Sequence, residues 1–551
     1  MISPNTDELP QGWWYPDQKQ PQADDLDFHK ALRQVTRPLY VVNLKGRAAV
    51  TQDGTITIGP VKPDGSDALP LLGYAPALHP RNLGDSQFKK AYHLRYAYIA
   101  GAMANGITSV EMVEAVGRAG MIGFFGAAGL LPDQIEAAVH LLQQRLGERP
   151  FGFNLIHSPA DPELESATVN LYLRNKVTLI SASAYLGLTL PLVYYRVQGL
   201  TRDSSGNVAC PNKIIAKVSR VEVARKFLEP PPEKYLRQLV ESNLISAQQA
   251  ALAAEIPMAD DVTAEADSGG HTDNRPALTL LPTMLALRDE ISQHYGYKNP
   301  VRVGLAGGIA TPHSTAAAFA MGAAYVLTGS VNQSCIEAGT SDTVRQMLAE
   351  ADQADVTMAP AADMFELGVK VQVLKRGTMF PLRATKLYEL YNRHNCYEDI
   401  PADQRAVLER DFFKCSFEDE WVQTRDFFTQ RDPRQIDLAE KDPKHKMALV
   451  FRSYLGQSSN WANAGDQTRK IDYQIWCGPA IGAFNHWVKG SFLENWENRE
   501  TVTVAMNLML GAAITTRVNW LRQQGIALPA GTERVFPLRL PEILQLVEGR
   551  L

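Results

Sequence analysis

The sequence predicts an α/β protein whose centre is a (β/α)8 TIM barrel, with a small β-containing domain before it and a mainly helical domain after it. Short apolar runs alternate with helical stretches between about residues 95 and 330. Eight such units over about 235 residues match this barrel in number and size. The alternative, an open doubly wound sheet, usually carries G-x-G-x-x-G after its first strand, and that motif is missing here. A length of 551 residues also exceeds a single core, so further domains are expected.

The expected barrel strands are short, continuous apolar runs, as in parallel strands that are buried on both faces. Each run ends where a helical pattern or a glycine turn begins. The runs cover residues 96–100, 121–125, 151–156, 177–181, 214–218, 262–266, 301–305 and 325–327.

The connections between these runs carry helix start and stop signals. After the first run, Thr108 and Glu111 have the spacing of a capping box, and the helix behind them is expected to stop at Gly120. Residues 132–146 have the pattern of the next helix. Between the fifth and sixth runs, three prolines open an insertion over residues 229–258 with a helical pattern. We expect this insertion to be a lid or a partner-facing appendage.

The regions on either side of the barrel have other patterns. Residues 1–92 hold Trp13, Trp14 and two apolar runs, 39–44 and 55–58, which are expected to pair as a hairpin. Residues 336–551 are aromatic-rich and mostly helical in pattern, so they are expected to cover the barrel mouth or form a dimer interface. The expected domains are therefore 1–92, 93–335 and 336–551.

Composition and charge narrow the class of protein. An apolar content of 45% and a charged content of 21% are typical of a soluble globular protein. A net charge of −5 does not favour a nucleic-acid or membrane-surface binder. The five cysteines lack C-x-x-C spacing, which argues against a zinc site or a disulfide framework. The first residues lack the apolar segment of a signal peptide and no run is expected to span a bilayer, so we expect a cytoplasmic protein.

Two consecutive strand ends are rich in small residues. The seventh run leads into Ala306, Gly307, Gly308 and Ile309, followed by Thr311 as a plausible N-cap and Pro312 at the first helical position. The eighth run leads into Thr328, Gly329 and Ser330. Loops after the seventh and eighth strands hold a phosphate in many barrels of this type, through backbone N–H groups and a helix N-terminus. The alternative is that these glycines form ordinary turns.

The sixth run ends in a cluster of chemically capable residues: Glu265, Asp267, Ser268, Gly269, Gly270 and His271. Glycines would let a flat ring approach the backbone, and a histidine can exchange a proton near neutral pH. A single loop histidine is more often a surface side chain, but a position at a strand end beside two glycines favours a catalytic role.

Three other strand ends complete the candidate site. Asn154 could bind the edge of a heterocycle, with a simple turn as the alternative. Lys217 could stabilise an anionic reduced flavin or extend into solvent. Ala102 and Met103 lie in a small-residue turn that would let a planar ring lie against backbone. One phosphate cradle and a planar head fit FMN, whereas a tightly held dinucleotide would usually need a Rossmann fingerprint.

Several segments resemble a known family. GAMANGITSVEMVEAVGRAGMIGFFGAAGL, FGFNLI, EADSGGH, GLAGGIATP and LTGS are similar to the FMN-dependent nitronate monooxygenase and enoyl reductase barrels over about residues 95–335. The lead region, the three-proline insertion and VKVQVLKRGTMFPLRATKLYELY with its helical tail resemble the PfaD-type enoyl reductase subunits of polyunsaturated fatty acid synthases and the related trans-acting reductases of polyketide synthases.

The resemblance implies reduction of a trans-2-enoyl thioester on an acyl carrier protein, with NADPH as reductant and FMN as relay. His271 matches the family's catalytic histidine, and the small-residue turns match positions that contact FMN. The family often has Glu where Asp267 stands, which leaves no defined role for that carboxylate. A homodimer is expected because dimers are the commonest assemblies. Two alternatives stay open: a nitronate monooxygenase that uses oxygen, and a non-catalytic barrel that serves as a scaffold in a synthase.

Overall fold

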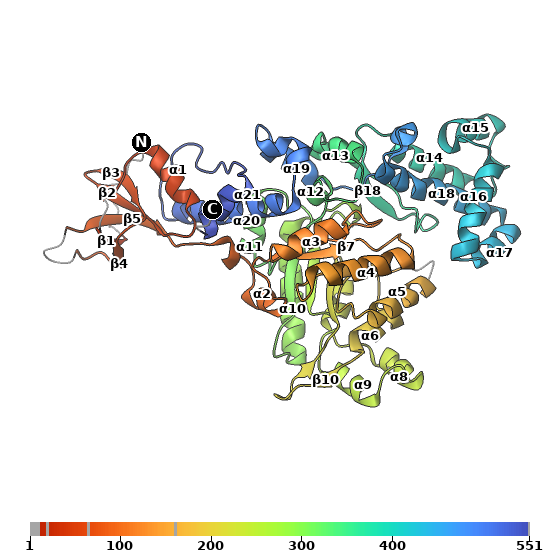
Figure 1. The fold of residues 1–551 in the computed structure, drawn as a ribbon, viewed down its shortest axis with the longest axis horizontal. Helices are drawn as coiled ribbons and strands as arrows, with labels where there is room; N and C mark the ends of the chain where they lie inside the picture. The colour runs from red at the N-terminus through yellow and green to blue at the C-terminus, as the bar shows by residue number, and fades with distance from the viewer. Residues whose placement is uncertain (1–10, 18–20, 63–66, 159–161, 549–551) are drawn as a thin grey trace.

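The computed structural model describes residues 11–17, 21–62, 67–158 and 162–548. Its centre is a closed barrel of parallel strands, which confirms the predicted fold class (Figure 1). Neighbouring strands of the barrel follow the order β12, β13, β15, β16, β6, β7, β8 and β9. Their bounds are β6 (Tyr98–Ala100), β7 (Ile122–Phe125), β8 (Gly152–Ile156), β9 (Leu179–Ser183), β12 (Lys213–Val218), β13 (Asp261–Glu265), β15 (Arg302–Ala306) and β16 (Val326–Thr328).

Each barrel strand overlaps one of the predicted apolar runs. The strands are buried on both faces, which explains why they read as continuous apolar runs rather than as an alternating pattern. The helices that surround the barrel are α3 (Val110–Arg118), α4 (Pro132–Leu146), α5 (Pro162–Arg174), α6 (Leu190–Val197), α7 (Val221–Leu228), α10 (Ala277–Tyr295) and α11 (Pro312–Ala320).

The N-terminal end of the barrel is closed by a buried polar and aromatic cluster. Asp261, which is 0% exposed, pairs with both nitrogens of the Arg302 fork at 2.6 and 2.8 Å and accepts a hydrogen bond from Tyr92. Phe88, from helix α2 (Ser86–Ala91), stacks on Tyr325 with ring centroids 4.3 Å apart. Because these groups satisfy one another, they stabilise this end of the barrel and leave the opposite end for a site.

The first barrel helix begins differently from the prediction. Ser109, not Thr108, is the N-cap of α3, and its hydroxyl accepts from the Met112 N–H at 3.1 Å. The Thr108 hydroxyl instead donates to the Gly101 carbonyl at 2.7 Å and accepts from the Met103 N–H at 2.9 Å. The predicted capping box was therefore wrong, because Thr108 is used to brace the turn after β6.

The N-terminal region forms a five-stranded antiparallel sheet in the order β3, β2, β5, β1, β4. Its strands are β1 (Gly12–Tyr15), β2 (Leu39–Leu44), β3 (Arg47–Thr51), β4 (Thr55–Ile58) and β5 (Leu69–Ala75). The predicted strands at 39–44 and 55–58 exist, but their predicted pairing was wrong. The intervening β3 takes the hairpin partner position beside β2, and β4 pairs with β1 instead. Residues 1–10, from which no signal peptide was expected, lie outside the described part of the chain.

A long C-terminal helix, α20 (Thr501–Gln523), joins the sheet to the barrel (Figure 1). By length and composition α20 could span a membrane, which corrects the expectation that no run is long enough, but 89% of its most apolar window is buried within the protein. It packs on α11, where Gly511 allows close contact with Pro312, and buried Arg517 donates to carbonyls of Leu32 and Arg37. α20 is therefore a core helix of this structure.

The insertion after β12 is helical as predicted, with α8 (Glu233–Glu241) and α9 (Ala247–Ala253). These helices lie beside α6, at the bottom of the barrel in Figure 1. None of the described residues of the insertion lines the cavity at the barrel mouth. Its predicted role as a lid on that mouth was therefore wrong, whereas a role toward a partner stays a prediction.

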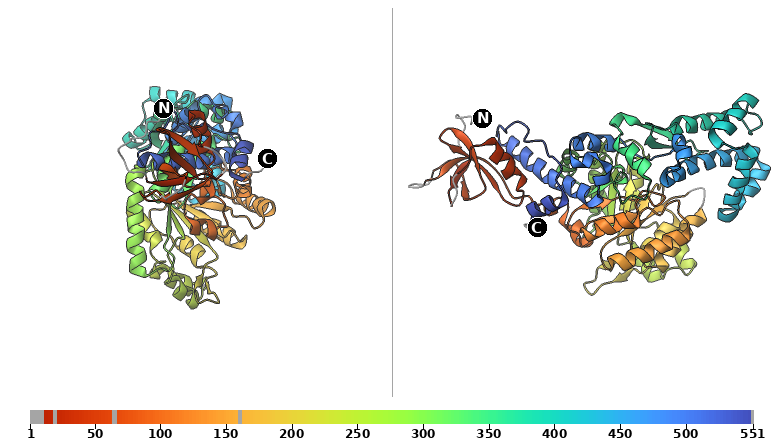
Figure 2. Two further views of the ribbon diagram at one scale, coloured as in Figure 1. Left: turned by 90° about the vertical axis from the view of Figure 1, so that its left-hand side faces the viewer. Right: turned by 45° about the horizontal axis from the view of Figure 1, so that its top comes forward.

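Residues 356–477, here called the cap, lie over the C-terminal end of the barrel, as predicted for one role of this region (Figure 2). The cap has a core of its own, built from apolar side chains of two strands and several helices. Its main elements are β17 (Val356–Pro360), β18 (Lys370–Leu374), α14 (Phe380–Arg393), α16 (Phe417–Arg431), α17 (Arg434–Lys441) and α18 (Pro443–Ala464). The expected boundaries at 92 and 335 stay predictions.

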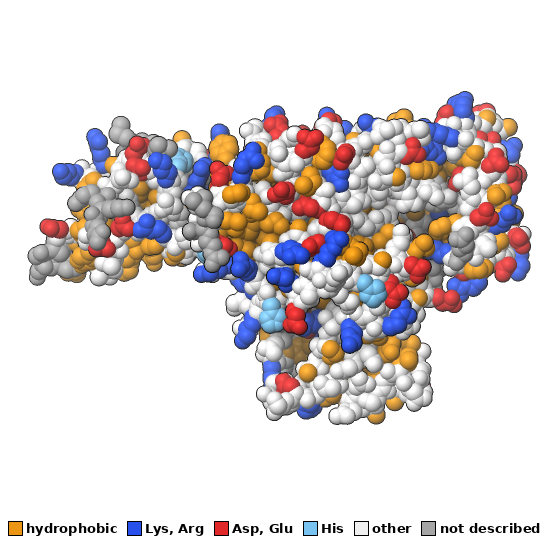
Figure 3. Space-filling model, in the orientation of Figure 1, with side chains coloured by type: hydrophobic (Ala, Val, Ile, Leu, Met, Phe, Trp, Pro, Cys, Tyr) orange, Lys and Arg blue, Asp and Glu red, His pale blue; other side chains and the backbone are white. Residues whose placement is uncertain are grey.

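Charged side chains of both signs are interspersed over the visible face, without a broad field of one sign (Figure 3). This distribution agrees with the modest net charge of −5. It does not favour recognition of a large polyanion by that face.

Candidate functional site

One cavity of about 880 Å³ lies between the C-terminal ends of the barrel strands and the cap. Every residue predicted for the site from the sequence contributes to its wall. These residues are Ala102, Met103, Asn154, Lys217, Asp267, Ser268, Gly269, Gly270, His271, Ala306, Gly307, Gly308, Ile309, Thr328, Gly329 and Ser330.

The turn after β15 has the geometry of an anion cradle. Gly307 and Gly308 have φ values of +82° and +75°, a conformation that glycine adopts without strain. A Cβ on Gly307 would lie 2.6 Å from the Ala266 backbone, whereas one on Gly308 would enter open space. Thr311 caps α11 by accepting from the Ser314 N–H, and Pro312 follows, as predicted.

The backbone amides at this point are free to bind a ligand. The N–H groups of Gly308 and Gly329 have no hydrogen-bond acceptor among the described residues. Buried or cavity-facing backbone donors usually have a partner, so two neighbouring turns with free donors fit one phosphate. The Thr328 side chain is directed to Tyr98 instead, and the Ser330 hydroxyl accepts from the Gly478 N–H at 3.0 Å.

Lys217, one of the predicted site residues, forms a largely buried ion pair. Lys217 Nζ lies 2.6 Å from Glu265 Oε1, and the Ser268 hydroxyl donates to the same oxygen at 3.0 Å. Lys217 therefore does not extend freely into solvent, and Glu265 compensates its charge. The sequence places Glu265 in the cluster at the end of the sixth run but gives it no role, and the structure supplies one as the partner of Lys217.

Part of the turn after β13 serves packing rather than ligand approach. A Cβ on Gly269 would lie 2.6 Å from the Cys477 backbone, so glycine is needed where the cap contacts the barrel. Asp267 accepts from the side-chain amides of Asn274 and Gln372, each at 2.8 Å. Asp267 thus fastens the turn to β18, which supplies the role that the sequence left undefined.

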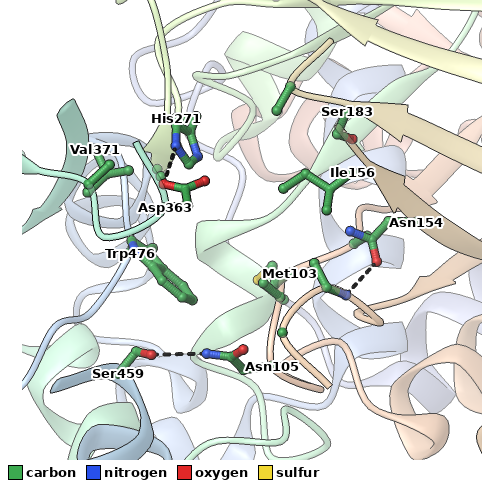
Figure 4. Close-up of a pocket in the computed structure, with 18 of the residues that line it drawn as sticks. Met103, Asn105, Asn154, Ile156, Ser183, His271, Asp363, Val371, Ser459 and Trp476 are labelled. Atoms are coloured by element: carbon green, nitrogen blue, oxygen red, sulfur yellow. Dashed lines mark hydrogen bonds and ion pairs between the residues drawn. The ribbon is translucent and has the colours of Figure 1, made fainter. Parts of the chain in front are cut away.

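His271 lies in the short strand β14 (Gly270–His271), which pairs antiparallel with β18 of the cap. Its Nε2 lies 3.2 Å from Oδ1 of Asp363, in the loop between β17 and β18 (Figure 4). The two atoms are within ion-pair distance, although their alignment is poorer than that of a directed hydrogen bond. Burial lowers the pKa of His271, but the close contact with the Asp363 carboxylate outweighs the effect of burial, so the net pKa is raised above 6.5.

Asn154 organises the opposite wall of the cavity. Its Oδ1 accepts from the Ala127 N–H at 2.7 Å and the Ala128 N–H at 3.2 Å, and its side chain is largely buried (Figure 4). The carbonyl oxygen is thus used by the protein, which leaves the Nδ2 donors for a ligand. Met103 stands beside this loop, and its backbone is held by Thr108.

The cap supplies residues that the sequence analysis missed. Trp476 and Val371 line the cavity near Asp363, and the Ser459 hydroxyl accepts from Asn105 Nδ2 at 3.0 Å across the mouth (Figure 4). No local motif marks these positions, because they reach the site only through tertiary packing. Among the described residues there is no cluster of His, Cys, Asp and Glu suited to a metal ion.

Comparison with known families gives two matches. A sequence model described as nitronate monooxygenase matches residues 86–392. A model described as the inserted helical domain of [acyl-carrier-protein] S-malonyltransferase matches residues 394–473, within the cap.

Individual relatives cover most of this chain. Polyketide biosynthesis protein PksE of Bacillus subtilis (strain 168) is 49% identical over 434 residues, which are 79% of this chain and 56% of PksE. A polyunsaturated fatty acid synthase subunit of Thraustochytrium sp. is 46% identical over 448 residues, 80% of this chain and 30% of that protein. The chain thus spans about half or less of the length of these relatives.

A solved structure is similar over nearly its whole length. The crystal structure of the enoyl reductase domain of MlnA, from the macrolactin biosynthesis cluster of Bacillus amyloliquefaciens, superimposes with a TM-score of 0.76 at 40% identity. The match covers 81% of this chain and 99% of that domain.

Proposed function

This chain belongs to the nitronate monooxygenase family of flavin oxidoreductases, and from that premise we propose that it is an FMN-dependent trans-2-enoyl thioester reductase with NADPH as reductant. The observation that carries the proposal is that both glycine turns and His271 line the same cavity. The similarity to an enoyl reductase domain supports reduction of an enoyl thioester in particular.

The residues of the cavity fit a flavin mononucleotide. The free amides of Gly308 and Gly329, with the N-terminus of α11, would hold its phosphate, and the Asn154 Nδ2 group would donate to its ring. When bound, the flavin supplies a hydride carrier between NADPH and the β-carbon of the substrate.

The protein's own groups would handle the proton. His271, whose pKa is raised by the neighbouring Asp363 carboxylate, would hold a proton that it can give to the α-carbon or use to polarise the thioester carbonyl. The cap covers part of the cavity, where Trp476 and Val371 form part of the wall. The Lys217 and Glu265 pair adds no net charge beside His271.

The relatives support a place in polyketide or polyunsaturated fatty acid synthesis, with the substrate delivered on an acyl carrier protein. We further propose that the active form is a cytoplasmic homodimer.

The test is anaerobic turnover of the yellow holoenzyme with NADPH and a short 2-enoyl thioester. We expect one NADPH consumed for each saturated thioester formed, with His271→Ala as the matched control of low activity. NADPH that is not oxidised in step with enoyl loss would contradict the proposal.

A second candidate activity is oxidation of a small nitroalkane by oxygen, which the family match over residues 86–392 favours. The same protein, in air and with a nitroalkane in place of the thioester, tests it. Oxygen consumption dependent on the nitroalkane, without any enoyl reduction, would select this function instead. A colourless protein that takes up no flavin would support a non-catalytic scaffold.

A further inference from the structure

We propose that Asp363 of the cap is a positioning residue that holds His271 protonated and selects Nδ1 as the ring nitrogen that gives up the proton. The inference rests on the proposed reductase function and deepens it. It means that the barrel supplies the proposed catalytic histidine, whereas the cap supplies the carboxylate that controls its protonation.

The backbone brings the two groups together. Antiparallel pairing places Gly270 opposite Gln372 and His271 opposite Val371, so the loop that precedes β18 must pass close to the imidazole. Asp363 lies in that loop and contributes Oδ1 at 3.2 Å from His271 Nε2. Both side chains line the cavity, so the pair faces the space that a substrate would occupy (Figure 4).

The exposure of the two ring nitrogens of His271 indicates which of them can exchange a proton with the cavity. His271 Nε2 is inaccessible to solvent and faces the carboxylate, so it cannot reach a substrate. The side chain as a whole is 30% exposed, and Nδ1 has no hydrogen-bond partner among the described residues. With the Nε2 proton directed to Asp363, proton exchange with the cavity must use Nδ1.

Three charged groups act on His271 from neighbouring elements. Asp363, from the cap loop, and Glu265, from β13, favour the imidazolium, whereas Lys217, from β12, opposes it. Because Lys217 and Glu265 pair with each other at 2.6 Å, their effects on His271 largely cancel. Asp363 is then the group whose removal should change the protonation of His271 most.

The loop is held independently of this pair. Arg452 of α18 donates through Nε to the Ala362 carbonyl at 2.9 Å and through Nη1 to Glu366 at 3.1 Å. Asp363 therefore can be replaced without removing the anchor of the loop. Glu366→Gln offers a matched control, because it removes a carboxylate charge from the same loop away from the cavity, while the new amide oxygen can still accept from Arg452 Nη1.

The experiment compares the holoenzyme with its Asp363→Asn, Asp363→Glu and Glu366→Gln variants. Histidine labelled with ¹³C in the ring is titrated by NMR, with His271→Ala to assign the signal, and kcat and KM are measured across pH. For Asp363→Asn we expect His271 to titrate at lower pH, with the alkaline limb of kcat moving in the same direction. Near neutral pH, kcat should fall about 10-fold, a part of the 10²- to 10⁴-fold supplied by a positioned general acid, with little change in KM.

The controls separate positioning from folding. Asp363→Glu should recover most of the activity and Glu366→Gln should behave as the unaltered enzyme. An unchanged His271 titration in Asp363→Asn would overturn the pairing, and a moved titration with an unchanged kcat profile would overturn the positioning role. If Asp363→Asn does not fold, Asp363→Ser takes its place in the same titration, and an unchanged His271 titration in that variant overturns the proposal. If the unaltered protein reduces no enoyl thioester, the proposed function fails, while the titration still decides the pairing.

Discussion

Replacement of Gly269 by alanine should loosen the cap from the barrel. The new Cβ would lie 2.6 to 2.8 Å from the Cα, C and N atoms of Cys477, and ordinary contact begins at 3.4 Å. One backbone must therefore move by about 0.8 Å in a close-packed region. Cys477 cannot easily yield, because it is fully buried and the Gly478 N–H next to it is bound to Ser330.

Overpacking of this kind costs about 1–3 kcal/mol, and we expect the upper end because the obstacle is backbone rather than a side chain that can rotate. The assay is amide hydrogen exchange of β14 and β18, together with thermal unfolding. Gly269→Ala should accelerate exchange in both strands by about 100-fold, which corresponds to about 3 kcal/mol of local stability. Gly329→Ala is the matched control, since its Cβ would meet nothing within 4 Å. Equal exchange in the two variants would refute the reasoning.

Gly308→Asp should give a colourless protein, because its carboxylate would enter the space proposed for the phosphate. Two like charges 4 Å apart repel by about 4 kcal/mol at an effective dielectric constant of 20. Gly308→Ala should keep more flavin, and equal flavin absorbance in the two variants would argue against the cradle. His271→Ala should retain flavin but lower kcat for enoyl reduction by about 10²-fold or more, and normal turnover would exclude a catalytic role. In the folded protein the pKa of His271 is raised and the pKa of Asp363 is lowered. Their pair should therefore stabilise the fold most between about pH 3.8 and pH 6.5, which are the pKa values of Asp and His in the unfolded chain. The excess stability of the unaltered protein over Asp363→Asn, measured by denaturant unfolding, should shrink as pH rises through the folded pKa of His271 or falls through that of Asp363; a difference that grows above neutral pH would contradict the assigned signs.

The barrel could be predicted because each buried parallel strand appears in the sequence as a short apolar run. A strand covered on both faces must be apolar at nearly every position, so each produces a short run that needs no alignment to detect. The cradle was equally readable, because Gly307, Gly308, Thr311 and Pro312 act within one turn of chain. Turns and helix caps of this kind depend on residues that are adjacent in the chain, so the sequence alone predicts them.

Other features depend on contacts that adjacent residues do not encode. Thr108 and Ser109 both offer a capping hydroxyl, and only the Gly101 carbonyl decides which one caps the helix. Gly269 and Gly308 look alike in sequence, but one permits backbone packing and the other faces open space. Asp363 reaches His271 through a strand pair of two residues, which is too short to show a periodic pattern.

The most direct measurement is a crystal structure of the yellow protein with its cofactor bound. The account predicts an FMN phosphate bound to the amides of Gly308 and Gly329, with the flavin ring beside His271. A phosphate bound elsewhere, or a ring that lies beyond the reach of His271, would contradict it.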